Sequence, residues 1–93
     1  MLVLLDRDGV LNEDSEDFIK NPDEFIMLEG AADAVARLNA AGHKVAIVTN
    51  QSGIGRGLFT DDMLQLIHNK LKSALHAKNG HVDAIFYCSD TPW

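Results

Sequence analysis

The fold of this chain is decided by its opening stretch, Met1-Leu-Val-Leu-Leu-Asp6-Arg7-Asp8-Gly9-Val10-Leu-Asn12. The apolar run from Leu2 to Leu5 is too short for a helix and is bounded by charged residues. Such a run is typical of a strand that is buried on both faces inside a parallel sheet. We therefore expect an α/β fold built around this strand.

Two carboxylates follow where this strand ends. Because side chains alternate along an extended chain, Asp6 and Asp8 are expected to project to the same side and Arg7 to point away. Gly9 then allows the backbone to turn sharply. Two carboxylates in one small volume are unfavourable unless a cation lies between them or one of them holds a proton. The pair therefore indicates a site of chemistry, although an isolated Asp-x-Asp more often just caps a loop.

A second strand is predicted over 45–48, after a helix over 31–41. The helix carries an apolar stripe and is stopped by Gly42. A strand, a crossover helix and a second strand form a right-handed unit that brings both strand ends to the same edge of the sheet. Thr49 should therefore lie beside Asp6, in the kind of crevice where open α/β sheets bind their ligands.

The segment after the second strand is rich in glycine and reads Thr49-Asn50-Gln51-Ser52-Gly53-Ile54-Gly55-Arg56-Gly57. Small residues let backbone amides approach an anion, Arg56 adds a guanidinium suited to phosphate oxygens, and Thr49 adds a hydroxyl donor. The alternative is a strand-to-helix connection whose glycines serve only to turn the chain. The segment has neither the Gly-Lys-Ser/Thr of a P-loop nor the register of a dinucleotide fingerprint.

The rest of the chain continues the same pattern. Thr60 is expected to cap a helix that runs to about Lys78 and is ended by Gly80, and a third strand follows over 82–87. His68 and His76 lie in this helix without the spacing of a ligand pair, so we interpret them as solvated or partly buried and assign no histidine to a metal.

Composition limits the possible functions. The 93 residues suit one small domain, and the formal net charge of -6, from 14 acidic and 8 basic residues, argues against a nucleic-acid partner and against an anionic membrane surface. Cys88 is the single cysteine, which excludes an intrachain disulfide and fits a reducing compartment. No apolar run approaches membrane-spanning length. We therefore expect a cytoplasmic protein.

The stretch from Asp6 to Asn12 resembles the first motif of the haloacid dehalogenase (HAD) superfamily phosphatases. The resemblance implies that Asp6 is the nucleophile that becomes an aspartyl phosphate, and that Asp8 is the general acid and base. It also implies a magnesium ion held by the Asp6 carboxylate and the Asp8 backbone carbonyl. A hard cation suits this chemistry, because a carboxylate and a phosphate dianion repel each other until both are neutralised.

The glycine-rich segment is similar to the second motif of one HAD branch, the D-glycero-D-manno-heptose 1,7-bisphosphate and histidinol-phosphate phosphatases. The resemblance implies that Thr49 binds the transferring phosphoryl group. The further phosphate- and substrate-binding candidates are Asn50, Gln51, Ser52 and Arg56. A heptose 1,7-bisphosphate is the expected substrate, and histidinol phosphate is the alternative. A polynucleotide 3'-phosphatase branch has a closely similar segment, but the acidic charge balance weighs against it.

Two more features are interpreted through the resemblance. The acidic segment from Glu13 to Phe25 corresponds to an insert that shapes the pocket, so Phe18 is a candidate substrate contact. Many heptose bisphosphate phosphatases open a zinc-binding loop with Cys-x-His at Cys88, but this chain has Asp90 in place of the histidine. We therefore expect no zinc, and a buried or half-buried free thiol at Cys88.

The resemblance covers only the first half of a HAD core. Residues 1–93 are expected to be a single partial domain with a Rossmann-like, three-layer architecture, a parallel sheet of strand order 3-2-1, and no C-terminal strands. The later lysine and acidic pair of the family are missing, so a catalytically incomplete phosphate-binding or assembly module is the alternative function. The first strand would be an exposed apolar edge, which natural proteins avoid, so we expect a fragment, or a homodimer or partner chain that covers it.

Overall fold

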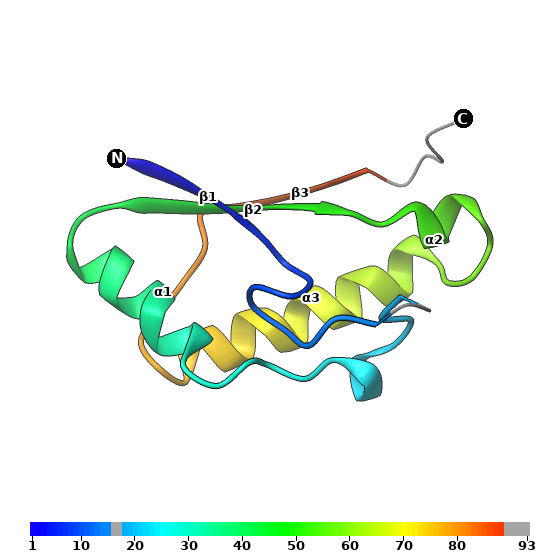
Figure 1. Ribbon diagram of the computed structural model, residues 1–93, viewed down its shortest axis with the longest axis horizontal. Coiled ribbons are helices and arrows are strands. Elements are labelled where there is room, and N and C mark those ends of the chain that lie inside the picture. Colours follow the sequence, from blue (N-terminus) through cyan, green and yellow to red (C-terminus); the bar gives the residue numbers. More distant parts are fainter. Residues whose placement is uncertain (16–17, 89–93) are drawn as a thin grey trace.

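The structure is a computed structural model in which residues 1–15 and 18–88 are described (Figure 1). Three strands alternate with helices along the chain, as the sequence predicts. The strands are β1 (Leu2–Asp6), β2 (Lys44–Asn50) and β3 (Ala84–Cys88), the helices are α1 (Ala31–Ala40), α2 (Ser52–Gly55) and α3 (Asp61–His76), and the short 3-10 helix is η1 (Pro22–Glu24).

The strands form one parallel sheet in the order β1-β2-β3, with β2 in the middle. This confirms the parallel α/β sheet and the predicted order 3-2-1. In the register of the sheet Asp6 pairs with Val48, and Asn50 pairs with Cys88. The carboxyl ends of all three strands therefore meet at one edge, as parallel crossover connections require.

Helices α1 and α3 cover one face of this sheet (Figure 1). Val35 of α1, Ile47 of β2 and Leu71 of α3 meet in a core in which each is at most 1% exposed. The apolar stripe of each helix thus faces the sheet, which is how short helices gain most of their stability. The described residues form two of the three expected layers, a sheet and one layer of helices.

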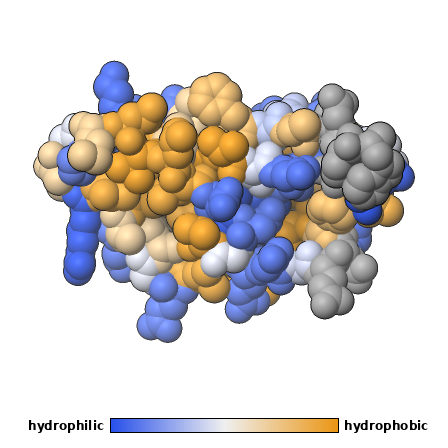
Figure 2. All heavy atoms as spheres, turned by 45° about the horizontal axis from the view of Figure 1, so that its top comes forward, coloured by the Kyte–Doolittle hydropathy of each residue, from blue (hydrophilic) through white to orange (hydrophobic). Residues whose placement is uncertain are grey.

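The opposite side of the sheet has no helix over it within the described residues, and we call it the open face. Figure 2 shows hydrophobic side chains gathered there. Its large apolar residues, each 43 to 61% exposed, are Leu2, Leu4, Val48 and Phe86. The prediction that the first strand is buried on both faces is therefore wrong for this structure, because alternate residues of β1 point to the uncovered side. The prediction that β1 forms an exposed edge agrees with the sheet order.

The ends of the elements follow local chemistry. Thr60 caps α3 as predicted, with its hydroxyl accepting a hydrogen bond from the backbone N–H of Met63 at 3.1 Å. Gly42 follows α1 with a φ of +86°, a conformation that favours glycine. Cys88 is exposed, which corrects the prediction of a buried or half-buried thiol. The reason is its register opposite Asn50, at the uncovered edge where the sheet ends.

Candidate active site

The ends of β1 and β2 build one small crevice. Asp6 is the last residue of β1, and Thr49 and Asn50 are the last two of β2. Together with Arg7 and Asp8 they line a cavity of about 200 Å³. Asp6 and Thr49 therefore lie in the same crevice, which is the juxtaposition that the strand-helix-strand unit predicts.

A tight loop fixes the first motif beyond β1. Gly9 has a φ of +82°, and its N–H donates to the carbonyl of Asn12 at 2.8 Å. The N–H of Leu11 donates to the carbonyl of Arg7, also at 2.8 Å. These bonds fold the chain back so that the buried Asn12 side chain reaches Asp8. The glycine is thus required by a real turn, as the sequence predicts.

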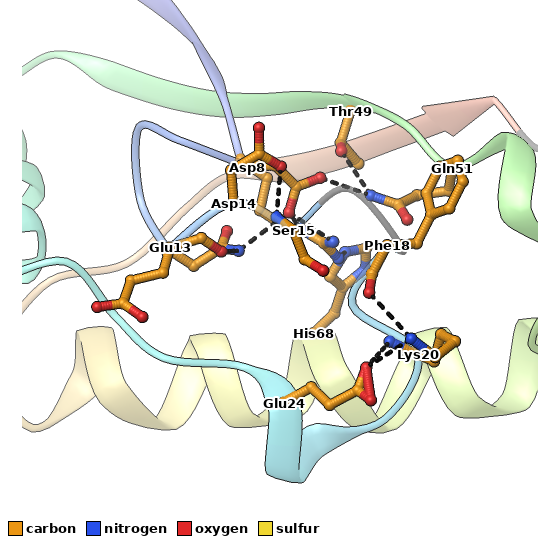
Figure 3. A network of polar contacts seen from close by, with 12 residues as sticks. Asp8, Glu13, Asp14, Ser15, Phe18, Lys20, Glu24, Thr49, Gln51 and His68 are labelled. Carbon is orange, nitrogen blue, oxygen red and sulfur yellow. Dashed lines mark hydrogen bonds and ion pairs between the residues drawn. The ribbon is translucent and has the colours of Figure 1, made fainter.

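The Asp8 carboxylate is held from several directions. Its Oδ1 accepts hydrogen bonds from Nε and Nη2 of Arg7 at 3.0 and 2.8 Å and from Nδ2 of Asn12 at 3.0 Å. Its Oδ2 accepts from Nε2 of Gln51 at 3.1 Å. Figure 3 shows the carboxylate facing Thr49 and Gln51, which come from the end of the neighbouring strand. A carboxylate held by this many donors is fixed in orientation.

Gln51 joins the two motifs. Its side chain is fully buried, and its amide nitrogen donates both to Asp8 and to the Thr49 hydroxyl, the latter at 2.9 Å. The buried amide oxygens of Gln51 and Asn12 have no hydrogen-bond partner among the described residues. Buried acceptors of this kind usually mark the place of a water or ligand donor. Gln51 therefore lies at the predicted site and leaves an acceptor beside Asp8.

Arg7 departs from the sequence prediction. It does not point away from the carboxylates, because β1 ends at Asp6 and strict alternation of side chains ends with it. Its fully buried guanidinium turns back to Asp8, and Nη1 lies 3.2 Å from Nε2 of His68 on α3. The sequence alone did not reveal this contact between residues far apart in the chain.

His68 is the other functional candidate that the sequence interpretation missed. It is 3% exposed. Burial, and then the positive charges of Arg7 and Lys72, lower the pKa of His68 to about 4, so the ring is neutral at ordinary pH. A signal was present in the sequence, because His68 lies four residues after Leu64 and three before Leu71, on the buried side of the helix.

Of the described side chains in the glycine-rich segment, those of Thr49 and Asn50 line the cavity. A Cβ built on Gly53 would come within 2.5 Å of Cε1 of Phe59 and 3.2 Å of Cγ of Phe18, so this glycine makes room for aromatic packing. The guanidinium carbon of Arg56 lies 6.0 Å from the centroid of the Phe18 ring. Neither Arg56 nor Phe18 is among the residues that line the cavity. The side chain of Ser52 lies outside the described part of the structure.

Two further hollows bear on the choice of site. One, of about 390 Å³, shares three residues with the small cavity and extends it along the open face; its lining is Asp6, Val48, Thr49, Asn50, Phe86, Tyr87 and Cys88. A larger one of about 550 Å³ lies between α1 and the segment that follows α3, and none of the predicted site residues line it. Chemistry, rather than size, therefore places the candidate site at the strand ends.

The donor atoms at the site are oxygens. Among residues 1–15 and 18–88 no cluster of three or more His, Cys, Asp or Glu side chains could hold a metal ion. Zinc prefers nitrogen and sulfur ligands in closed sets, whereas magnesium needs only one or two carboxylates and keeps several waters. Asp6 and Asp8 line the crevice, and the side chains of Asn12 and Gln51, whose amide oxygens have no partner among the described residues, both bond to Asp8. These oxygen donors fit a hydrated magnesium ion. In the same described ranges, no helix is both long and apolar enough to cross a membrane.

Comparisons with known proteins agree with this chemistry. No family model matches the chain. It is 52% identical over 91 residues to a D-glycero-beta-D-manno-heptose-1,7-bisphosphate 7-phosphatase of Bordetella bronchiseptica, covering 98% of this chain and 51% of that protein. The D,D-heptose 1,7-bisphosphate phosphatase from B. bronchiseptica, solved with magnesium and phosphate, superimposes with a TM-score of 0.95 at 52% identity, over 98% of this chain and 51% of that one.

A more distant structure gives the same fold. This structure is of a Mesorhizobium loti protein that is provisionally described as a HAD-like phosphatase. It superimposes with a TM-score of 0.85 at 32% identity, covering 95% of this chain and 42% of that one. The chain spans about half the length of the curated relatives that it matches, with shares of 51% and 48% for the first two.

Proposed function

We propose that this chain, which belongs to the HAD-like phosphatases and matches the N-terminal half of the heptose 1,7-bisphosphate phosphatases, carries the nucleophile and the acid-base group of a phosphate monoester hydrolase. The observation that carries the proposal is the crevice in which Asp6, Asp8 and Thr49 meet. One carboxylate can attack phosphorus there, a second can move a proton, and a hydroxyl can donate to a phosphate oxygen.

The reaction has two steps. A carboxylate oxygen of Asp6 forms a bond to phosphorus as the bond to the leaving oxygen breaks, and Asp8 gives its proton to that oxygen. A water then attacks the phosphorus of the aspartyl phosphate, Asp8 takes the proton of the water, and the carboxylate of Asp6 is released. Thr49 and Asn50, which both line the crevice, are the residues proposed to hold the phosphoryl group during both steps. Gln51 aligns Asp8 with Thr49 through the two hydrogen bonds of its amide.

Magnesium is the proposed cofactor, with the Asp6 carboxylate and the Asp8 backbone carbonyl as its protein ligands. When bound, it supplies the positive charge that lets an anionic carboxylate approach an anionic phosphate ester. A relative of closely similar structure was solved with magnesium and phosphate, which supports this choice. Zinc is not part of the proposal.

The proposed substrate is a small phosphorylated sugar, D-glycero-D-manno-heptose 1,7-bisphosphate, because the names of the relatives point to it. Histidinol phosphate is the alternative within the same branch. Arg56 and Ser52 are proposed contacts of the substrate, together with Phe18 on the segment that packs against Arg56. A cytoplasmic location is part of the proposal, as is the absence of nucleic-acid and membrane partners.

We further propose that additional polypeptide covers the open face. A row of exposed apolar side chains on a sheet is a typical interaction surface, and the relatives are about twice as long as the matched segment. The proposed cover is the polypeptide that corresponds to the second half of those relatives, with a second copy of the chain as the alternative. This cover would also supply the lysine and the acidic pair that the described residues do not bring to the site.

Phosphate release tests the function. We expect the whole protein to release phosphate from heptose 1,7-bisphosphate only when magnesium is present, and Asp6→Asn to abolish release. Asp62→Asn, which removes an exposed carboxylate in the first turn of α3, is the matched control and should keep the activity. Binding of phosphate compounds without turnover at any magnesium concentration would favour the second candidate, a phosphate-binding or assembly module.

A further inference from the structure

Arg7 is a charged side chain with no exposed surface. Its guanidinium carbon lies 6.0 Å from the centroid of the Phe25 ring, which is itself 1% exposed. Burial of a charge is unfavourable unless the charge is paired and its N–H groups are hydrogen-bonded. Arg7 meets this requirement with only two partners from the described residues, the Asp8 carboxylate on one side and His68 on the other.

The contact with Arg7 fixes the state of His68. A guanidinium has donors only and keeps its protons in proteins, so Nε2 of His68, 3.2 Å from Nη1, must be the acceptor. The ring is then neutral, with its proton on Nδ1. The lowered pKa of His68, about 4, is consistent with this state. The ring of Tyr87 packs edge-on against His68 from β3, with the ring centroids 6.3 Å apart. His68 is thus a packed, neutral support behind Arg7.

The two oxygens of Asp8 are not equivalent. Oδ1 accepts three hydrogen bonds, two from Arg7 and one from Asn12, whereas Oδ2 accepts only that of Gln51 within the described part of the chain. Three donors saturate the lone pairs of one oxygen, so Oδ1 has no room for a proton. Oδ2, on the side of Thr49, keeps an open position.

We propose that Arg7 and His68 are positioning residues that lock the Asp8 carboxylate, so that Oδ2 is the oxygen through which Asp8 gives and takes the proton. This rests on the proposed phosphatase function. In the first step the proton leaves Oδ2 for the departing alkoxide as the bond between phosphorus and that oxygen breaks. In the second step Oδ2 receives a proton from the water that attacks phosphorus. His68 is not among the residues that line the cavity, and the side chain of Arg7 has no exposed surface, so both act through Asp8.

Substrates with different leaving groups distinguish a loss of Asp8 positioning from a general structural effect of the substitution. An alkyl phosphate needs a proton from Asp8 for its alkoxide to leave, whereas 4-nitrophenyl phosphate leaves as a stable anion and needs little help. We expect His68→Leu in the whole protein to lower kcat/KM about tenfold or more for the alkyl ester and much less for the aryl ester, since kcat/KM reports the first step. An equal loss for both esters would overturn the proposal.

His68→Gln is the matched variant. Its amide oxygen offers an acceptor near the place of Nε2, so we expect it to restore most of the kcat/KM that His68→Leu loses on the alkyl ester. A Gln variant as impaired as the Leu variant, with both folded by circular dichroism, would overturn the role of the acceptor.

An NMR measurement tests the same pair without turnover. In the ¹⁵N-labelled protein we expect the His68 ring to carry its proton on Nδ1 at neutral pH, and its Nε2 signal to shift in Arg7→Met. A proton on Nε2, or an unchanged signal in that variant, would overturn the inference. If the wild-type protein hydrolysed neither ester, the proposed function would be wrong, and the tautomer would still decide whether His68 supports Arg7.

Discussion

At the scale of single residues, the site depends on where each side chain leaves the backbone. Asp6 and Thr49 were predictable because both lie at strand ends, where alternation and the crossover rule fix direction. Arg7 and Asp8 lie past the end of β1, so their directions come from the turn at Gly9 and from contacts with α3. Contacts of this kind depend on tertiary packing, and no local pattern in the sequence encodes them.

The buried His68 predicts a loss of stability in mild acid. Its pKa is about 4 in the folded protein and near 6.5 when exposed, so the unfolded chain binds the extra proton first as the pH falls. The stabilising contribution is complete above pH 6.5 and is lost progressively between pH 6.5 and 4. At about 1.4 kcal/mol per pKa unit, the full shift of the His68 pKa sets an upper limit of about 3.5 kcal/mol on this loss.

Urea unfolding at a series of pH values measures this loss. His68→Gln cannot titrate in this range, so its stability should change less between pH 6.5 and 4 than that of the wild type. If the unfolding free energies of the two proteins changed equally with pH, His68 would not be buried in the neutral form.

At the scale of elements, hydrophobic periodicity and capping residues predicted the three strands and two longer helices. The largest differences between predicted and observed bounds are at the strands. β2 extends to Asn50 because it pairs with β3 up to Cys88, and pairing between strands is not visible in one segment of sequence. The sequence of the glycine-rich segment predicts an anion-binding loop, or alternatively a connection whose glycines only let the chain turn. The structure adds a third use, because Gly53 accommodates the ring of Phe59.

Gly53→Ala tests this packing. The added methyl group would overlap Phe59, and overpacking of this kind costs about 1 to 3 kcal/mol of unfolding free energy. We expect the variant to unfold at lower urea concentration than the wild type. The double variant Gly53→Ala with Phe59→Leu removes the ring atom that causes the overlap and should be less impaired than additivity predicts. Strictly additive losses would contradict the packing role of Gly53.

At the scale of the whole molecule, the chain buries one face of its sheet and exposes the other. The continuous apolar run of β1 predicts a strand covered on both sides, whereas the described residues cover it on one side and leave Leu2 and Leu4 exposed. No helix of the described residues lies over the open face, and its large apolar side chains are exposed. The proposal of covering polypeptide therefore makes its own prediction.

Substitutions on the open face test whether it is covered in the whole protein. Leu4→Lys would place a charge in a buried interface, and we expect a loss of about 2 kcal/mol or more in unfolding free energy. Leu66→Lys is the matched control: Leu66 is 51% exposed, similar to the 61% of Leu4, but lies on α3 away from the sheet. Its effect should stay within about 0.5 kcal/mol. Equal and small effects of the two substitutions would mean that the open face remains in solvent.

The central claim is that Asp6 is the nucleophile, and trapping of the phosphorylated protein tests it most directly. The protein is mixed with magnesium and a phosphate monoester, quenched, and reduced with borohydride, which converts an aspartyl phosphate to homoserine. We expect peptide mass spectrometry to find homoserine at position 6 and nowhere else, and no conversion in Asp6→Asn. Phosphate release by the wild type without any conversion at Asp6, or conversion at a different aspartate, would contradict the account.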